Sequence, residues 1–129
     1  PEAQVLALRL GAQLLDICLA AAAGKLAEAR AAFAEDAALT VVMAAQGYPG
    51  DFARGEAIGL PAVRDPRCAI FHAGTGLTDG VLVSNGGRVL NLTARAATLA
   101  EARALAYGLV DAVDWPGGFF RRDIGWRAL

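Results

Sequence analysis

A pair of adjacent arginines followed by an aspartate, Arg121, Arg122 and Asp123, is the cluster most suggestive of chemistry in this sequence. A guanidinium donates two parallel, charge-assisted hydrogen bonds, which suits it to a phosphate. Adjacent residues of an extended segment point to opposite faces, so one arginine can face a cleft while the other is held inward. Asp123 would orient one of them. A surface ion pair, worth about 0–1 kcal/mol, explains the same cluster equally well.

Two other segments carry residues that suit a binding site. Gly47, Tyr48 and Pro49 follow an apolar run, and a turn rich in glycine and proline lets the backbone approach a ligand closely. An ordinary turn with Tyr48 packed on a sheet is the simpler interpretation. Arg88, directly after residues 85–87, would place a second cation at the same anion, or it is a solvated charge beside a hairpin.

No catalytic residue is predicted in this chain. His72, the single histidine, lies between apolar residues, and we expect a structural side chain that is hydrogen-bonded to a backbone carbonyl. One histidine and two cysteines are too few for a zinc cluster, so no metal ligand is predicted. The sequence also lacks a Walker loop, a nucleophile elbow and a dinucleotide-binding glycine motif.

The first third of the chain should contain helices and one strand. Apolar residues at helical spacing predict one long helix over residues 1–23 and a shorter, alanine-rich helix over residues 25–33. The β-branched apolar run at residues 39–45 predicts a strand buried on both faces. Residues 46–66 carry several Gly and Pro residues and predict a long loop, which is more often functional than accidental.

The remaining elements predict the fold class. Strands are expected at residues 68–73 and 81–84, and the Asn-Gly sequence at residues 85–86 predicts a hairpin into a strand over residues 88–93. Alternation in that last strand places Asn91 and Thr93 toward water. Thr98 and Glu101 form a capping box before a helix, and residues 119–122 suit a closing strand. The expected class is α+β: amino-terminal helices, then an antiparallel sheet with one packed helix.

Composition narrows the class of function. The 129 residues are 56% hydrophobic and 19% charged, which predicts a packed core in one domain, or one domain plus an appended element. A net charge of −1 argues against nucleic acid as a partner. Polar residues interrupt the apolar opening, so no membrane span or secretory signal is expected. Cysteine usage is typical of reduced thiols and a cytoplasmic location.

Four motifs together resemble the carboxy-terminal part of the phosphoribosylamine–glycine ligases, ATP-grasp enzymes of purine biosynthesis also called glycinamide ribonucleotide synthetases. The motifs are VVMAAQGYPGD (41–51), FHAGT (71–75), NGGRVL (85–90) and FRRDIG (120–125). They occur in the family's order and at compatible spacings, which makes the combination specific. The opening PEAQ (1–4) is similar to the end of the family's F-G-D-P-E-x-Q segment, so the resemblance covers almost the whole chain.

The resemblance implies a ligase that joins 5-phosphoribosylamine to glycine with ATP hydrolysis and releases glycinamide ribonucleotide, ADP and phosphate. In the family ATP phosphorylates the glycine carboxylate, and the amine then attacks the acyl phosphate, with magnesium neutralising phosphoryl charge. It also implies that Arg121 and Arg122 contact the substrate phosphate, with Asp123 orienting them. Gly47, Tyr48 and Pro49 would shape the cleft wall, and Arg88 is a weaker candidate.

The resemblance further implies that essential parts of the ligase lie outside this chain. The family's ATP-binding lobes and magnesium ligands precede the F-G-D-P-E segment, inside which the chain starts. We therefore expect a terminal helical part of the ATP-grasp domain at residues 1–36 and the C domain at residues 37–129. Such a fragment, without the ATP, Mg²⁺ and glycine sites of the missing amino-terminal domains, is expected to be inactive alone.

Two other classes of function remain open at the level of sequence. One is a non-enzymatic α+β anion-binding or interaction module that uses the arginine cluster. The other is a structural subunit whose apolar amino-terminal helix docks on a partner chain. An exposed apolar stripe on that helix is expected in either the fragment or the subunit, and it would favour association.

Overall fold

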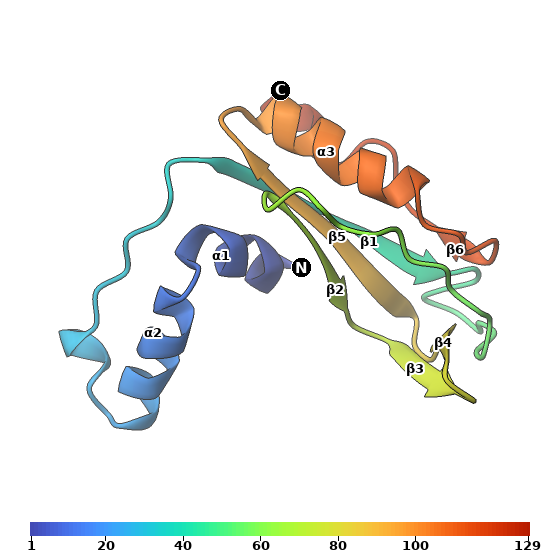
Figure 1. Cartoon of the computed structure of the whole chain (residues 1–129), viewed down its shortest axis with the longest axis horizontal. Helices are drawn as coiled ribbons and strands as arrows, with labels where there is room; N and C mark the ends of the chain where they lie inside the picture. The colour runs from blue at the N-terminus through green and yellow to red at the C-terminus, as the bar shows by residue number, and fades with distance from the viewer.

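A four-stranded antiparallel sheet with strand order β2-β5-β1-β6 organises the chain (Figure 1). The computed structural model describes all 129 residues. Its strands are β1 (Ala37–Ala45), β2 (Cys68–His72), β3 (Thr75–Thr78), β4 (Val81–Ser84), β5 (Arg88–Ala96) and β6 (Gly118–Phe119). Strands β3 and β4 form a separate two-stranded hairpin. The expected α+β class with an antiparallel sheet is confirmed.

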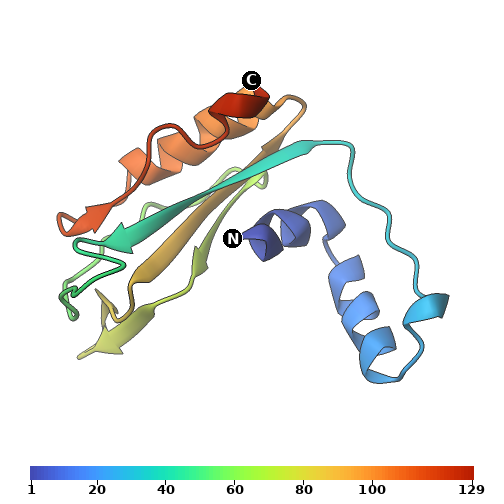
Figure 2. The ribbon, with the colours of Figure 1, turned by 180° about the vertical axis from the view of Figure 1, so that it is seen from behind.

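Helices lie on both faces of this sheet. They are α1 (Glu2–Leu10), α2 (Gln13–Ala22) and α3 (Leu99–Asp111), with short 3-10 turns η1 (Leu26–Glu28) and η2 (Trp126–Ala128). Helix α3 runs along one face of β1 and β5, while α1 lies against the opposite face, as both views show (Figures 1 and 2). We call these the α3 face and the α1 face of the sheet.

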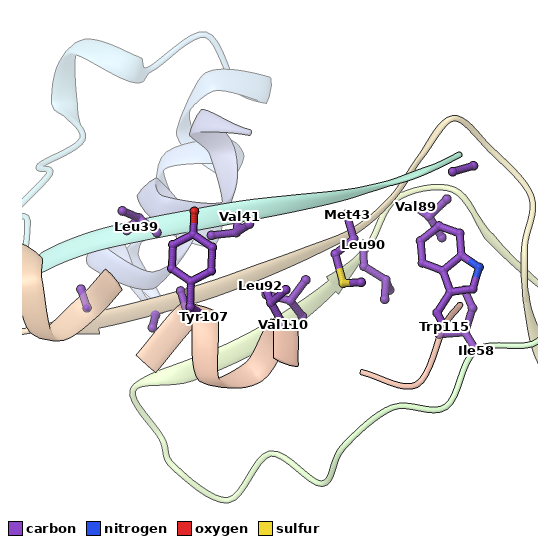
Figure 3. Close-up of a cluster of buried hydrophobic side chains, with 14 of the residues drawn as sticks. Leu39, Val41, Met43, Ile58, Val89, Leu90, Leu92, Tyr107, Val110 and Trp115 are labelled. Atoms are coloured by element: carbon purple, nitrogen blue, oxygen red, sulfur yellow. The ribbon is translucent and has the colours of Figure 1, made fainter. Parts of the chain in front are cut away.

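Strand register decides which side chains occupy each face. Leu92 lies opposite Val41, and Leu90 lies opposite Met43, so all four point to the α3 face and are buried there. Tyr107 and Val110 of α3 pack onto this layer (Figure 3). The alternate pairs, Thr40 with Thr93 and Val42 with Asn91, point to the α1 face.

The expected long helix over residues 1–23 is wrong, because two helices bent by 110° occupy this segment. Gly11 separates them with a φ of 56° and a ψ of −135°, a conformation that a residue with a Cβ strongly avoids. No single helix of the chain is long and apolar enough to cross a membrane; only the bent pair α1 and α2 together reaches the required length and composition.

The expected helix over residues 25–33 is also wrong, since only η1 is helical there. Backbone groups in the following segment bond to the amino-terminal helices instead of to one another. The Ala34 N–H donates to the Arg9 carbonyl oxygen at 2.9 Å, and the Ala32 N–H donates to the Gln13 Oε1 at 3.0 Å. These tertiary bonds hold the segment in an extended form despite its helical composition.

The expected hairpin at residues 85–87 is wrong as well. Strand β4 pairs with β3 across Asp79 and Gly80, while β5 pairs with β1 and β2. The Asp-Gly turn is therefore the hairpin, and residues 85–87 pass the chain from one sheet to the other. Because β5 is a central strand covered on both faces, Asn91 and Thr93 are buried rather than directed to water.

Several local expectations are confirmed. Strands β1 and β2 form where expected, but β1 is fully buried only on the α3 face, since Thr40 and Val42 are partly exposed. Residues 46–66 hold only the isolated bridges of Ala57 with Val83 and Gly59 with Asp114. The Thr98 Oγ1 accepts from the Glu101 N–H at 3.2 Å, and the Glu101 carboxylate accepts from the Thr98 N–H at 3.3 Å. The closing strand expected at residues 119–122 is wrong: β6 covers only Gly118–Phe119, and residues 120–122 lead into a turn.

Candidate functional site

The α1 face of the sheet contains a hollow of about 390 Å³ near the end of β1. Side chains of β1 form its apolar floor, and Phe119, Phe120 and Ile124 line its side. Tyr48, Arg88 and Arg121 lie on its rim although they come from three distant parts of the sequence. Three of the predicted site segments therefore meet at one place.

A second hollow of about 420 Å³ adjoins the first and shares Tyr48 and Arg88 with it. Its further lining includes Gln4 of α1 and Asn91 of β5. We refer to the two together as the α1-face hollow. It combines cationic side chains, an aromatic wall and side-chain amides, which is the composition expected for a small polar anion.

Packing against glycine places Tyr48 in this hollow. The Ala45 N–H donates to the Gly87 carbonyl oxygen at 2.8 Å, which brings the turn after β1 against the start of β5. A Cβ on Gly87 would lie 2.2 Å from the Cδ2 of Tyr48, so only glycine allows the ring to lie there. Two motifs that are separate in sequence thus form one wall. The Tyr48–Pro49 peptide bond is cis.

An irregularity in strand register places Arg88 in the hollow. The pairing of β1 with β5 shifts between Met43 and Ala44, so that Ala44 lies opposite Arg88. Regular alternation from Asn91 would turn Arg88 to the α3 face. The shift instead directs Arg88 to the hollow and Val89 into the core beside Trp115 (Figure 3).

Arg121 is oriented by the aspartate that the sequence predicted for this role. The Nε and Nη2 of Arg121 donate to the two carboxylate oxygens of Asp123 at 2.8 and 2.5 Å. These hydrogen bonds lower the pKa of Asp123 and raise the pKa of Arg121. The pair uses two of the five guanidinium N–H groups, so the other three remain for a ligand.

Arg122 points away from the hollow. Its guanidinium donates to both carboxylate oxygens of Asp111 on α3, at 3.2 and 2.6 Å, and lies 4.6 Å from the ring centroid of Phe120. This pairing lowers the pKa of Asp111. The adjacent arginines therefore lie on opposite sides, although Arg122 stands in a turn rather than in the expected extended strand, and Arg122 does not line the hollow.

Helix α3 holds the Arg121 turn through two side chains that the sequence analysis did not single out. The Tyr107 hydroxyl donates to the Arg121 carbonyl oxygen at 2.6 Å and accepts from the Ile124 N–H at 3.1 Å. Arg103 donates to the carbonyl oxygens of Arg122 and Ile124 at 2.6 and 2.9 Å. Arg103 and Tyr107 are four residues apart and therefore lie on the same face of α3, and this spacing was the sequence signal that could have identified them as a pair.

His72 lies outside the hollow. It is exposed at the end of β2, and its Nδ1 lies 3.0 Å from the Thr75 Oγ1. The expected backbone carbonyl partner is therefore wrong: the exposed imidazole contacts a side-chain hydroxyl instead. No group of three or more His, Cys, Asp or Glu side chains in the chain could hold a metal ion.

These features define an α+β domain that presents an arginine-lined hollow on the open face of an antiparallel sheet. Residues 38–127 match the family model described as phosphoribosylglycinamide synthetase, C domain, and the chain belongs to this family. The resemblance that the four sequence motifs indicate is thereby confirmed.

Curated relatives named phosphoribosylamine–glycine ligase match the full length of the chain. The phosphoribosylamine–glycine ligase of Mesorhizobium japonicum is 52% identical over 130 residues, covering 100% of this chain and 31% of that protein. The chloroplastic ligase of Arabidopsis thaliana is 47% identical over 133 residues, covering 100% and 25%. The chain thus spans between a quarter and a third of the length of these relatives.

A solved structure shares the fold. The crystal structure of the phosphoribosylamine–glycine ligase from Thermotoga maritima matches 95% of this chain and 30% of its own, with a TM-score of 0.82 and 35% identity. The relatives are named as ligases, and residues 38–127 of this chain match the C domain of the family.

Proposed function

We propose that this chain acts as the carboxy-terminal part of a phosphoribosylamine–glycine ligase, and that its α1-face hollow binds the phosphate of 5-phosphoribosylamine. The observation that carries the proposal is the meeting of Arg121, Arg88 and Tyr48 around one hollow. Family membership supplies the reaction: 5-phosphoribosylamine, glycine and ATP give glycinamide ribonucleotide, ADP and phosphate.

The chemistry of a phosphate group fits the free donors of the hollow. Arg121 is held by Asp123 and still has N–H groups to donate, so a phosphate can bind without reorganising the side chain. Arg88 adds a second positive charge on the same rim. The apolar floor strengthens both interactions because it replaces water near the charges.

The donor set of this chain does not fit a magnesium site, since no cluster of acidic side chains is present. We therefore assign Mg²⁺, ATP and glycine to the parts of the ligase beyond this stretch. In the proposed reaction this chain positions the phosphoribosylamine so that its amine meets the activated glycine carboxyl group. The chain alone would then be inactive.

We further propose the division into a helical part at residues 1–36 and a C domain at residues 37–129. The leucines of α2 and η1 support it, because Leu15, Leu19 and Leu26 are all more than half exposed. Such apolar side chains are expected to pack on the remainder of the ligase. A cytoplasmic location fits the two free cysteines, although the Arabidopsis relative is named as chloroplastic.

The test is a comparison of arginine variants in the full-length ligase that contains this chain. Arg121→Ala should raise the KM for 5-phosphoribosylamine roughly 10-fold or more, since a charge-assisted hydrogen bond is worth about 1.5–3 kcal/mol. The KM values for ATP and glycine should change by less than about twofold. Arg122→Ala should have a smaller effect than Arg121→Ala on the KM for 5-phosphoribosylamine.

Arg67→Ala is the matched control. Arg67 forms the same two-residue, bidentate pair with Asp65, and this pairing lowers the pKa of Asp65 to about 2, but the pair lies away from the hollow. It should leave all three KM values unchanged. Equal effects of Arg121→Ala on the three substrates, or none, would reject the phosphate assignment and favour a non-catalytic interaction role for the arginine cluster.

A further inference from the structure

One polar side chain in the centre of the sheet has no partner in the chain. Asn91 lies in the middle of β5, is only 5% exposed, and sits between Val42 and Phe71 on the neighbouring strands. None of the side-chain hydrogen bonds of the chain involves its amide. The only fully buried side-chain polar atom without a partner is the Gln4 Oε1, so the Asn91 amide reaches the surface of the hollow, where a ligand can bond to it.

A neighbouring polar residue of the same strand does have a hydrogen-bond partner within the chain. Thr93 lies two residues further along β5, on the same α1 face, and is fully buried. Its Oγ1 lies 2.7 Å from the Thr40 Oγ1 on the paired strand, so both hydroxyls are bonded. The Asn91 amide instead borders the α1-face hollow together with Arg88 and Tyr48.

A second side-chain amide, that of Gln4, lines the same hollow. The Oε1 of Gln4 is buried and has no hydrogen-bond partner. Gln4 lines the hollow from α1, whereas Asn91 lines it from the sheet. Each amide offers both donor and acceptor atoms, while the arginines on the rim only donate. The hollow therefore has a cationic side and a neutral side that can accept and donate.

We propose that Asn91, assisted by Gln4, binds the hydroxyl groups of the sugar whose phosphate is held by Arg121 and Arg88. A sugar hydroxyl both donates and accepts, which matches an amide, and a phosphate only accepts, which matches a guanidinium. The inference rests on the proposed function for the phosphate, and it adds the residues that distinguish a phosphorylated sugar from a bare phosphate. Asn91 lies outside the four motifs that identify the family.

The test uses two probes on the full-length ligase, ribose 5-phosphate and inorganic phosphate, with affinities measured by titration calorimetry. Asn91→Ala should lower the affinity for ribose 5-phosphate roughly fivefold to tenfold, as expected for the loss of a neutral hydrogen bond. It should change the affinity for inorganic phosphate by less than about twofold. Arg121→Ala should weaken the binding of both probes, because both contain a phosphate group.

Thermal unfolding without ligand supplies an independent readout. Because the amide has no partner in the chain, Asn91→Ala should leave the Tm unchanged or raise it, whereas loss of a bonded amide would lower the Tm. Asn91→Ser, which keeps a donor and an acceptor, should restore part of the affinity for ribose 5-phosphate.

Three results would overturn the inference: no binding of ribose 5-phosphate by the unaltered ligase, an equal effect of Asn91→Ala on both probes, or a lowered Tm. The last would mean that another part of the ligase bonds to the amide. If Arg121→Ala affects neither probe while Asn91→Ala selectively weakens ribose 5-phosphate, the hydroxyl site stands and the phosphate assignment fails.

Discussion

The two faces of the sheet use the same strands in opposite ways. On the α3 face, Val41, Leu90 and Leu92 are fully buried beneath α3 together with Ile58 and Trp115, and the layer is apolar and closed (Figure 3). On the α1 face, a short helix covers only part of the strands, and a hollow remains beside Asn91 and Arg88. The difference indicates that stability comes mainly from the first face, while the second is available for binding.

Polar groups follow the same division. On the α3 side they are bonded within the chain: the Trp115 Nε1 donates to Glu56 at 2.7 Å, and the Tyr107 hydroxyl both donates and accepts. On the α1 side, the buried Gln4 Oε1 has no partner, and the Asn91 amide at the hollow has none within the chain. Polar groups near the core usually have partners, so two amides without one beside the same hollow favour ligand binding on this face.

The largest expected effect tests the closed face. Leu92→Ala removes a fully buried side chain beneath α3 and should lower the free energy of unfolding by about 2–5 kcal/mol. Val42→Ala on the α1 face should cost less, because Val42 is only partly buried and already borders the hollow. Urea denaturation of both variants measures the difference. Similar losses at the two positions would contradict the division between the faces.

The next effect tests the wall of the hollow. Gly87→Ala places a Cβ against the Tyr48 ring and should lower the free energy of unfolding by about 1–3 kcal/mol, because the ring must move. It should also weaken the binding of 5-phosphoribosylamine. Gly108→Ala is the control: nothing lies within 4 Å of its added Cβ on α3, and it should stabilise the protein by about 0.5–1 kcal/mol. Unchanged substrate affinity in Gly87→Ala would remove Tyr48 from the site.

A smaller effect is expected where Tyr107 of α3 supports the turn that carries Arg121 at the α1-face hollow. Tyr107→Phe deletes the hydroxyl that holds Arg121 and Ile124, and should lower the free energy of unfolding by about 1–2 kcal/mol. Because the turn that carries Arg121 loosens, the KM for 5-phosphoribosylamine should rise while kcat changes little. Denaturation and steady-state kinetics of the full-length ligase measure both. An equal fall in kcat would indicate a general loss of structure.

The smallest effect is confined to the start of α3. Thr98→Ala removes a capping hydrogen bond to the Glu101 N–H and should lower the free energy of unfolding by about 1 kcal/mol. Substrate affinity should not change, because the cap is not part of the hollow. Thr98→Ser keeps the hydroxyl and should restore most of the lost stability, which thermal unfolding measures. A shift in the KM for 5-phosphoribosylamine would show that the two faces are more strongly coupled than their contacts indicate.

Sequence reasoning succeeded where the deciding contacts are local. The capping box at Thr98, the strand over residues 39–45 and the pairing of Asp123 with an arginine each depend on residues within a few positions of one another. It was wrong for the hairpin at residues 85–87, since two turn signals competed and pairing partners decided between them. The role of the site residues in binding stays a prediction.

By itself, the sequence determined the α+β class, the family and the residue types available for a phosphate site. Each of these depends on side-chain chemistry and periodicity, which can be read without knowing which distant residues are in contact. Only the tertiary structure decided that Arg88 turns to the hollow while Val89 enters the core, that Arg121 rather than Arg122 faces it, and that Asn91 is buried without a partner. These outcomes follow from strand register, a shift in pairing and the cover that each helix provides. All three depend on contacts between residues far apart in the chain.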